Sequence, residues 1–392
     1  MRTLLSLFLI SISVNAFSQH DFFDVIPLGD KKVGFCDSLI FCDQEKYDQY
    51  GYEGAYPLFL QIWHPLNDSV DGKQLTLKEL RERSLSEELE GVYQSLIQKM
   101  DSASVWYNVS QDFVDYDSIG YGGYTHYEVL DTFMNYKTHS IYHTLEKNTG
   151  YPVIVYHHGA QGLSDENFAM AEYFASRGYI FISSNYHLPL ENKTYGHSQG
   201  SKQESVRITK RVMNFAKDIS QGEDIFYIGH SWGAQIGLSF LFEPDWAKAF
   251  VSMETTLEFW SKEDVSNKWT TLDDILKKHR KDYNLPILFM ANTMEDKPFE
   301  IFEDINKGYG MHVSSKLEFG HESYTSAYLL RYMFEEQFPQ PDVPEMKEQY
   351  ELYSKHLEFI ENFLLSCNKN SKLDFNKYNK DFFIHQFNNQ VD

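Results

Sequence analysis

Length, composition and charge set the first limits on this protein. The chain has 392 residues, of which 42% are hydrophobic, and this share predicts a sizeable folded core rather than a disordered chain. The length suits one domain with insertions better than two large domains. A formal net charge of −22 argues against nucleic acid and anionic membrane surfaces as partners, because both are bound by clustered Lys and Arg.

The first residues have the features of a secretory signal. Arg2 precedes an apolar run over residues 4–14, which is too short to span a bilayer. Small residues follow at Ala16 and Ser18, where cleavage fits the usual pattern. We therefore assign residues 1–18 to a signal peptide and expect a secreted or periplasmic protein. Charges interrupt the later apolar runs, so we expect no transmembrane segment.

A β-hairpin over residues 33–66 is the first predicted element, because apolar side chains alternate along 57–65. Cys36 and Cys42 lie close together in this hairpin. Export would permit a disulfide between them, which would leave Cys367 unpaired. No group of Cys and His has the spacing of a zinc site, so we expect structural thiols and no bound metal.

The middle of the chain divides into an irregular part and a regular one. Residues 67–149 are predicted to be an insertion, and 255–283, longer than a simple connection, are a candidate lid. From residue 151 short apolar strands alternate with amphipathic helices, which is typical of a parallel sheet covered on both faces. The predicted strands are 152–159, 179–187, 224–231, 247–254, 285–293 and 312–321, with helices at 168–175, 208–219 and 232–242 and from residue 323.

The C-terminal residues 337–392 are predicted to be a helical extension of a domain that spans 19–336. Apolar side chains recur at helical spacing from Met346 to Leu364. This helix either docks on the domain or pairs with a second copy, so a monomer and a homodimer both stay open. Docking is favoured because fewer than three full heptads are present.

Two segments match the nucleophile motif Gly-x-Ser-x-Gly, one centred on Ser231 and the other on Ser198. In a nucleophile elbow the serine occupies a sharp turn between a strand and a helix. An apolar strand precedes Ser231 and a helical run follows it, whereas a polar stretch containing proline precedes Ser198. We therefore predict an α/β-hydrolase fold with Ser231 as its nucleophile, and we assign Ser198 to a surface loop.

A serine nucleophile needs a base, and the base needs an acid that orients it. In this fold the chain order is Ser, then Asp or Glu, then His. His321 lies just past the last predicted strand and is the candidate base. Glu254 ends the strand after the elbow helix, and Glu295 and Asp296 end the next strand. All three carboxylates satisfy the order, so the residues alone leave the acid open.

An oxyanion hole requires two backbone N–H groups aimed at the developing negative charge. One is expected from Trp232, the residue after the nucleophile. The other is expected from the Gly-rich loop 157–162, in which Ala160 is placed to donate. We expect no organic cofactor, since this chemistry uses side chains and backbone alone.

Several segments resemble the secreted platelet-activating-factor acetylhydrolase family and its dienelactone-hydrolase-like bacterial relatives. They are "PVIVYHHGAQG", "AEYFASRGYIFISSNYH", "IGHSWGA" and "VSMET", together with "KKVGFCD" and "LFLQIWHPL" near the start. The resemblance covers about residues 31–66 and 150–335. It does not extend to 67–149 or to the tail.

The resemblance implies Glu254 as the acid. In that family the acid follows the nucleophile by one helix and one strand, at the end of an "ALD"-like segment, and this chain has "SME" there. Glu in place of Asp adds a methylene that the site must accommodate. The family's oxyanion positions fall on Ala160 and Trp232. The resemblance further implies a secreted serine hydrolase that cleaves small or lipid-like carboxylic esters through an acyl-enzyme.

Two other functions fit the same pattern. A serine peptidase or amidase would use the same triad, and a catalytically silent fold would act as a binding module. The intact Ser231, His321 and elbow glycines argue against a silent fold. The sequence leaves the ester open among short acyl esters, phospholipids, acetylated sugars and polyesters.

Overall fold

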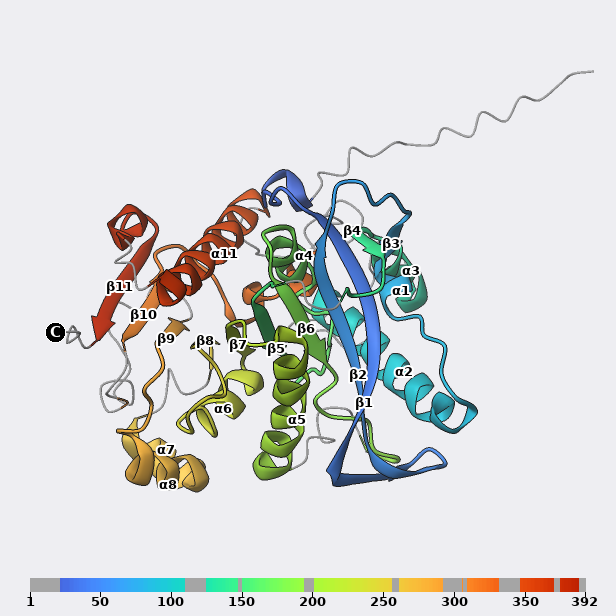
Figure 1. Ribbon diagram of the computed structural model, residues 1–392, viewed down its shortest axis with the longest axis horizontal. Helices are drawn as coiled ribbons and strands as arrows, with labels where there is room; N and C mark the ends of the chain where they lie inside the picture. Colours follow the sequence, from blue (N-terminus) through green and yellow to red (C-terminus); the bar gives the residue numbers. More distant parts are fainter. Residues whose placement is uncertain are drawn as a thin grey trace, which may run out of the picture.

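One β-sheet runs through the molecule (Figure 1). The computed structural model describes residues 22–109, 125–146, 150–193, 201–255, 261–291, 305, 309–330, 346–369 and 374–387. Within these residues the strands are β1 (Lys32–Gln49), β2 (Tyr52–Leu66), β3 (Gln74–Thr76), β4 (Lys137–Tyr142), β5 (Val153–His157), β6 (Ile180–Ser184), β7 (Ile225–His230), β8 (Ala249–Met253), β9 (Ile287–Ala291), β10 (Gly310–Ser315) and β11 (Phe382–Phe387). Their order across the sheet is β11-β10-β9-β8-β7-β5-β6-β2-β1-β4-β3.

The centre of the sheet is parallel and its two sides are mixed. Strands β6, β5, β7, β8, β9 and β10 are neighbours that run in one direction. On one side β2 joins β6 antiparallel and forms a long hairpin with β1, which is the hairpin predicted for 33–66. On the other side β11 closes the described sheet antiparallel to β10. The central strands are short and wholly buried, as expected of strands covered on both faces.

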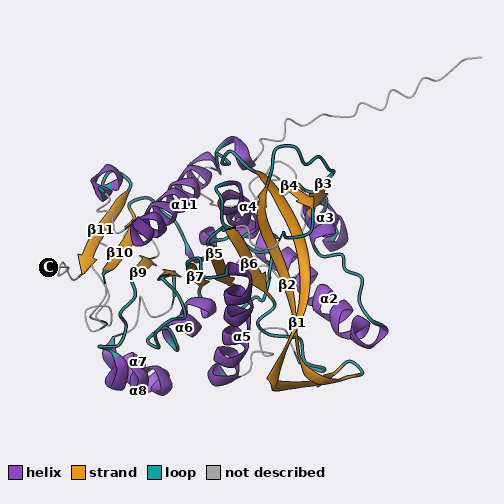
Figure 2. Ribbon diagram, viewed as in Figure 1, coloured by secondary structure: helices purple, strands orange, loops and turns teal. Residues whose placement is uncertain are grey.

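Helices cover both faces of this sheet (Figure 2). They are α1 (Leu77–Leu80), α2 (Glu87–Val109), α3 (His126–Met134), α4 (Phe168–Ser176), α5 (Lys202–Ser220), α6 (Trp232–Leu238), α7 (Lys262–Lys268), α8 (Thr270–His279), α10 (Ser326–Leu329) and α11 (Met346–Lys369), with the 3-10 turns η1 (Phe22–Asp24), η4 (His321–Tyr324) and η6 (Phe375–Tyr378). Along β5, Ile154 and Tyr156 enter one core, while Val153 and Val155 enter the other, because successive side chains of a strand point to opposite faces. Helices α4 and α11 pack in the first core, and α5, α6, α7 and α8 in the second.

The predicted fold class is confirmed, with differences in individual elements. The helix after the elbow ends at Leu238, shorter than the predicted 232–242. Helix α5 begins at residue 202, earlier than its apolar periodicity indicated. Ser201 caps its first turn by accepting a hydrogen bond from the Glu204 N–H, which explains the earlier start. Such a polar first turn carries no apolar signal.

The chain between β2 and β5 adds strands to the edge of the sheet. Strand β4 pairs parallel to β1, and β3 pairs antiparallel to β4. Helix α2 packs Leu89, Val92 and Leu96 into the second core, beside the β1–β2 hairpin (Figure 1). The helical spacing of apolar residues from Leu89 to Met100 predicts this helix, whereas the strands β3 and β4 have no such signal in the less regular sequence of 67–149.

The C-terminal residues hold more than the predicted helix. The apolar side of α11 enters the first core, with Tyr350, Tyr353, Leu357 and Ile360 buried, so the helix docks on the domain. Strand β11 then pairs with β10 over its whole length. The sequence prediction assigned this region to helix alone and missed β11.

The three cysteines are buried and free. Cys36 and Cys42 lie on the same strand, β1, opposite Ile62 and Tyr56 of β2. Six residues of extended chain separate their Cα atoms by about 20 Å, whereas a disulfide needs about 7 Å or less. The disulfide that export would have permitted between them is therefore excluded by the strand. Among the described residues, none of the helices combines the length and apolar character that a membrane crossing requires.

Candidate active site

Ser231 occupies a sharp turn between the end of β7 and the start of α6. Its backbone has φ 50° and ψ −110°, a conformation that residues other than glycine rarely adopt. A Cβ at Gly229 would lie 2.5 Å from the Ala234 backbone nitrogen, and one at Gly233 would lie 2.1 Å from the His157 carbonyl oxygen. The two glycines of the motif therefore let the helix pack closely against two strands. This is the geometry of a nucleophile elbow.

The strand next to β7 supports the turn and brings a carboxylate to it. The Ser231 N–H donates to the carbonyls of Met253 and Glu254, at 3.0 and 3.1 Å. Glu254 follows β8 directly and is 2% exposed. Its own N–H donates to the Met290 carbonyl on β9 at 2.8 Å. Because parallel strands end at the same edge of the sheet, Glu254 lies beside the elbow.

The Glu254 carboxylate contacts the histidine predicted as the base. His321 begins η4, past the end of β10, and its Nδ1 meets Glu254 Oε2. The His321 side chain is 33% exposed, so one part of the ring faces outward while Nδ1 faces the buried acid. Burial and the neighbouring His230 lower the pKa of His321, which favours the neutral ring. A neutral ring is the form that a general base requires.

The structure thus brings together Ser231, Glu254 and His321. The other two candidate acids, Glu295 and Asp296, lie outside the described residues, and so does Ser198. One of the three carboxylates that the sequence left open is therefore placed against His321, and it is the one that the family resemblance implied.

The loop predicted for the oxyanion hole lies against the elbow. It follows β5, and a Cβ at Gly159 would lie 3.1 Å from His230 Nδ1 and 3.4 Å from Ser231 Cβ. The next residue, Ala160, is half-buried, and His187 forms a hydrogen bond to its backbone. Trp232 begins α6, where a backbone N–H has no carbonyl of its own helix to bind. Both predicted donors therefore border the turn of Ser231.

The candidate lid borders the same turn. Lys202 Nζ lies 3.0 Å from the ring centre of Trp269, between α7 and α8, and 5.1 Å from that of Trp232. It also donates to Gln235 Oε1 on α6 at 3.1 Å. Burial lowers the pKa of Lys202 to about 7. The described part of 255–283 therefore contacts α6 through Lys202, whose amino group lies near the indole rings of Trp269 and Trp232.

Sequence reasoning missed a polar segment, Asp165 to Asn167, between the oxyanion loop and α4. Glu166 accepts hydrogen bonds from the Tyr156 hydroxyl at 2.6 Å and from the Gly159 N–H at 3.1 Å. Asn167 donates to the carbonyl of Tyr324, in the turn that begins at His321, at 3.0 Å. The three polar residues lie in a turn that carries no periodicity, so their only sequence signal is their place between the Gly-rich loop and an apolar helix.

The same segment holds the insertion. Asp165 accepts two hydrogen bonds from the guanidinium of Arg81, at 2.6 and 2.9 Å. Arg81 also donates to Asp101 of α2 at 2.8 Å. A cavity of about 560 Å³ lies beside this ion cluster, between α1, α2 and α3, and Ser231, Glu254 and His321 do not line it. The insertion is therefore connected to the candidate site through Asp165 rather than through that cavity.

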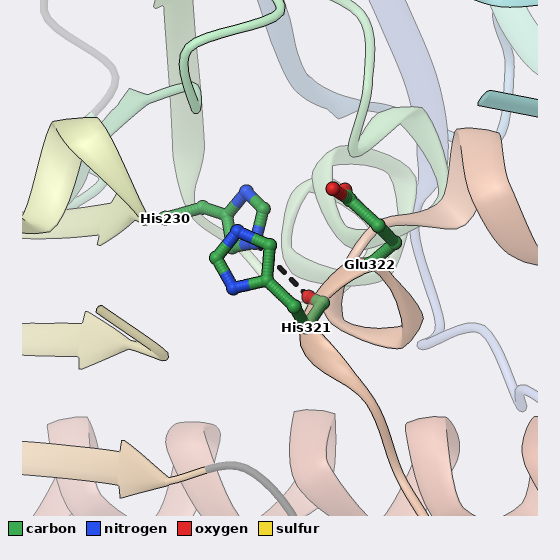
Figure 3. A group of neighbouring side chains, drawn as sticks. All are labelled: His230, His321 and Glu322. Atoms are coloured by element: carbon green, nitrogen blue, oxygen red, sulfur yellow. Dashed lines mark hydrogen bonds between the residues drawn. The ribbon is translucent and has the colours of Figure 1, made fainter. Parts of the chain in front are cut away.

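Three side chains near the elbow have atoms that metals bind. Ligand atoms of His230, His321 and Glu322 lie within 4.8 Å of one another. Figure 3 shows the two imidazole rings next to each other and the hydrogen bond between His230 and the His321 carbonyl. That bond engages His230 Nε2 at 3.1 Å, and Glu254 engages His321 Nδ1. A cation here would compete with both contacts, so the arrangement fits a hydrogen-bonded site better than a metal centre.

The parallel sheet, the elbow after β7 and the carboxylate and histidine that follow in chain order define an α/β-hydrolase fold. A family model described as alpha/beta hydrolase fold matches residues 152–281, about a third of the chain. That range contains the elbow and Glu254 but ends before His321. None of the curated proteins matches the chain by sequence.

A solved structure with a TM-score above 0.5 agrees with this fold. A ferulic acid esterase from Streptomyces cinnamoneus superposes with a TM-score of 0.54 at 13% identity, over 93% of this chain and 99% of that one. Est1E from Butyrivibrio proteoclasticus has a TM-score of 0.36 at 15% identity, over 57% of this chain and 90% of that one. The monoacylglycerol lipase of Paleococcus ferrophilus has a TM-score of 0.34 at 14% identity, over 55% of this chain and 96% of that one. At 13% identity, the likeness to the ferulic acid esterase shows a shared fold and nothing beyond it.

Proposed function

We propose that this protein is a carboxylic ester hydrolase in which Ser231 is the nucleophile, His321 the general base and Glu254 the acid. The observation that carries the proposal is the contact between the Glu254 carboxylate and His321 Nδ1 beside the elbow of Ser231. A carboxylate at Nδ1 fixes the tautomer in which Nε2 accepts a proton. The strained turn presents the serine hydroxyl at the edge of the sheet.

The reaction follows from these positions. Nε2 of His321 takes the proton of the Ser231 hydroxyl as its oxygen attacks the ester carbonyl. The N–H groups of Ala160 and Trp232 stabilise the negative oxygen of the tetrahedral intermediate. The imidazolium, stabilised by Glu254, then protonates the leaving alcohol and an acyl-enzyme remains. Water repeats the sequence and releases the carboxylic acid, which restores the serine hydroxyl.

The proposed substrates are small or lipid-like esters, in line with the platelet-activating-factor acetylhydrolase family that the sequence resembles. The ferulic acid esterase supports ester hydrolysis on a fold of this kind, but a fold hosts many activities. The acyl and alcohol groups are therefore to be read from a substrate panel.

We also propose export, because residues 1–18 have the pattern of a signal peptide. The mature chain is expected to begin near Phe17 or Gln19. N-terminal sequencing of protein recovered outside the cytoplasm tests this. An intact Met1 on that protein would contradict export through this signal.

An activity-based probe and a substrate panel test the hydrolase proposal. A fluorophosphonate is expected to label Ser231, as read by peptide mapping, and to abolish turnover. Of matched p-nitrophenyl esters and p-nitroanilides, the esters are expected to be cleaved with the higher kcat/KM. Faster cleavage of the anilides would indicate a peptidase or amidase. Absence of labelling in folded protein would overturn the proposal in favour of a binding module.

A further inference from the structure

Glu166 and His230 form a buried pair next to the candidate active site. Both residues are 0% exposed, and Glu166 Oε1 lies 3.3 Å from His230 Nδ1. Burial opposes charge on both groups, yet their contact holds the pKa of Glu166 below and that of His230 above its usual value. Such a pair is weak evidence of stabilisation by itself, because desolvation offsets the attraction. Its contacts indicate its role.

The Glu166 end of the pair holds the oxyanion loop. Glu166 Oε1 accepts the Gly159 N–H at 3.1 Å, and Gly159 precedes the proposed donor Ala160. The Tyr156 hydroxyl donates to the same oxygen at 2.6 Å. The Glu166 backbone carbonyl accepts from the Ser326 hydroxyl and the Ala327 N–H, at 3.1 and 2.8 Å, so α10 holds the segment from the other side.

The His230 end holds the histidine turn. His230 Nε2 lies 3.1 Å from the carbonyl oxygen of His321, the bond drawn in Figure 3. The ring centres of His230 and His321 are 4.8 Å apart. His230 is also the residue before Ser231. One buried pair therefore touches the backbone of the oxyanion loop, the elbow and the turn that carries the proposed base.

We propose that Glu166 and His230 are positioning residues that hold the oxyanion loop and the His321 turn in register with Ser231. This inference rests on the function proposed above. The two residues act as a unit because a carbonyl oxygen at Nε2 requires a proton there. In a neutral ring whose only N–H is at Nδ1, facing Glu166, the lone pair of Nε2 would face the oxygen of the His321 carbonyl, and the two would repel each other. With Glu166 ionised, the doubly protonated ring donates through Nε2 to the His321 carbonyl and forms an ion pair through Nδ1 with Glu166.

The test compares Glu166→Gln, His230→Gln and the double variant with the parent protein on p-nitrophenyl acetate. Each single variant is expected to lower kcat about ten- to hundredfold with KM within about twofold, since small displacements of reacting groups cost rate rather than binding. The double variant is expected to lose no more than the worse single variant, because residues that act as a unit are not additive.

Glu172→Gln is the matched control. Glu172 is also a glutamate at 0% exposure, on the following helix α4, but it bonds to Ser140 in the insertion and not to the elbow. The kcat of the Glu172→Gln variant is expected to equal that of the parent protein. Equal loss in Glu172→Gln, or additive losses in the double variant, would overturn the proposal. So would parental kcat in both single variants.

Folding and the proposed function are tested separately. If Glu166→Gln does not fold, His230→Gln carries the comparison. If neither folds while Glu172→Gln does, the pair is structural and the positioning role is overturned. Ser231→Ala decides the function itself: if it retains activity, the hydrolase assignment fails. If Ser231→Ala is inactive while both pair variants are fully active, the positioning role alone fails.

Discussion

At the scale of single residues, Ser231 combines an unfavourable backbone conformation with the proposed role of nucleophile. A positive φ in a residue other than glycine costs about 1–3 kcal/mol. The two carbonyls that accept its N–H, from Met253 and Glu254, belong to the neighbouring strand and hold the turn in place. Strain held by the surrounding structure is typical of active sites. The same carbonyl contacts tie the proposed nucleophile to Glu254, the proposed acid.

Ser231→Ala should abolish ester hydrolysis and leave the fold intact. Alanine keeps the Cβ of serine, so the backbone and the two flanking glycines meet the same neighbours. The expected loss in kcat is at least about a thousandfold, as for other serine nucleophiles. Ester turnover and circular dichroism measure the two effects. Ser198→Ala is the control and should be near neutral. Loss of activity in that variant alone would place the nucleophile there.

Glu254→Gln should preserve shape and lower the rate. Glutamine fits the same space but cannot stabilise the imidazolium of His321, so kcat should fall on the order of a thousandfold or more. The near-isosteric change Asp296→Asn should cost far less. Steady-state kinetics of both variants decide between the acids. A heavy loss in Asp296→Asn with a mild one in Glu254→Gln would assign the role to Asp296.

At the scale of elements, helix α4 joins the insertion to the domain through a buried carboxylate. The Ser140 hydroxyl of β4 donates to Glu172, which is 0% exposed. Burial raises the pKa of Glu172 from 4.5 to about 7, partly offset by this and other hydrogen bonds. Below about pH 4.5 the folded and unfolded chains both carry this proton. Between that pH and about 7 only the folded chain keeps it, so stability falls as pH rises.

Glu172→Gln should remove that pH dependence. The penalty from the raised pKa approaches about 3 kcal/mol above pH 7, because one pKa unit corresponds to about 1.4 kcal/mol. The variant should therefore gain stability relative to the parent at pH 8 by more than it does at pH 5. Urea unfolding at the two pH values measures the difference. An equal difference at both would show that Glu172 is ionised to the same extent in the folded and unfolded chains.

At the scale of the whole molecule, the C-terminal region completes the sheet and supports the histidine turn. Helix α11 buries its apolar side in the first core, and β11 extends the sheet beyond β10 (Figure 1). Gln349 of α11 donates to the Glu318 carbonyl at 2.8 Å and accepts from the Ser323 hydroxyl at 3.2 Å. These two residues flank His321, so the end of the chain holds the turn of the proposed base.

Leu357→Ala should destabilise the protein by about 2–5 kcal/mol, the usual cost of truncating a fully buried leucine. Leu357 is 0% exposed in the first core. Leu317→Ala is the control, since that side chain is 43% exposed and its loss should change stability by less than about 0.5 kcal/mol. Thermal unfolding compares the two variants. A small effect of Leu357→Ala would mean that α11 contributes little to the core.

Local pattern was enough for most of the fold and for the elbow. The face of a strand or helix that becomes buried carries apolar residues at the period of that element. This pattern can be read from each segment separately. The motif around Ser231 was separable from that around Ser198 because its flanking residues predict a strand and a helix. His321 followed from its place just past the last predicted strand and from the chain order. The short polar starts of elements, such as the first turn of α5, carry no apolar period and were missed.

Contacts between distant segments were decided only by the tertiary structure. Glu254 meets His321 because β8 lies beside β7 and its end faces the turn after β10, and no local period encodes that strand order. The pair of Glu166 and His230 is likewise invisible in sequence, since its partners are 64 residues apart. Cys36 and Cys42 show the converse: they are near in sequence and held apart by an extended strand. Hydropathy is a property of each residue and can be read locally, whereas a site depends on the order of the strands in the sheet.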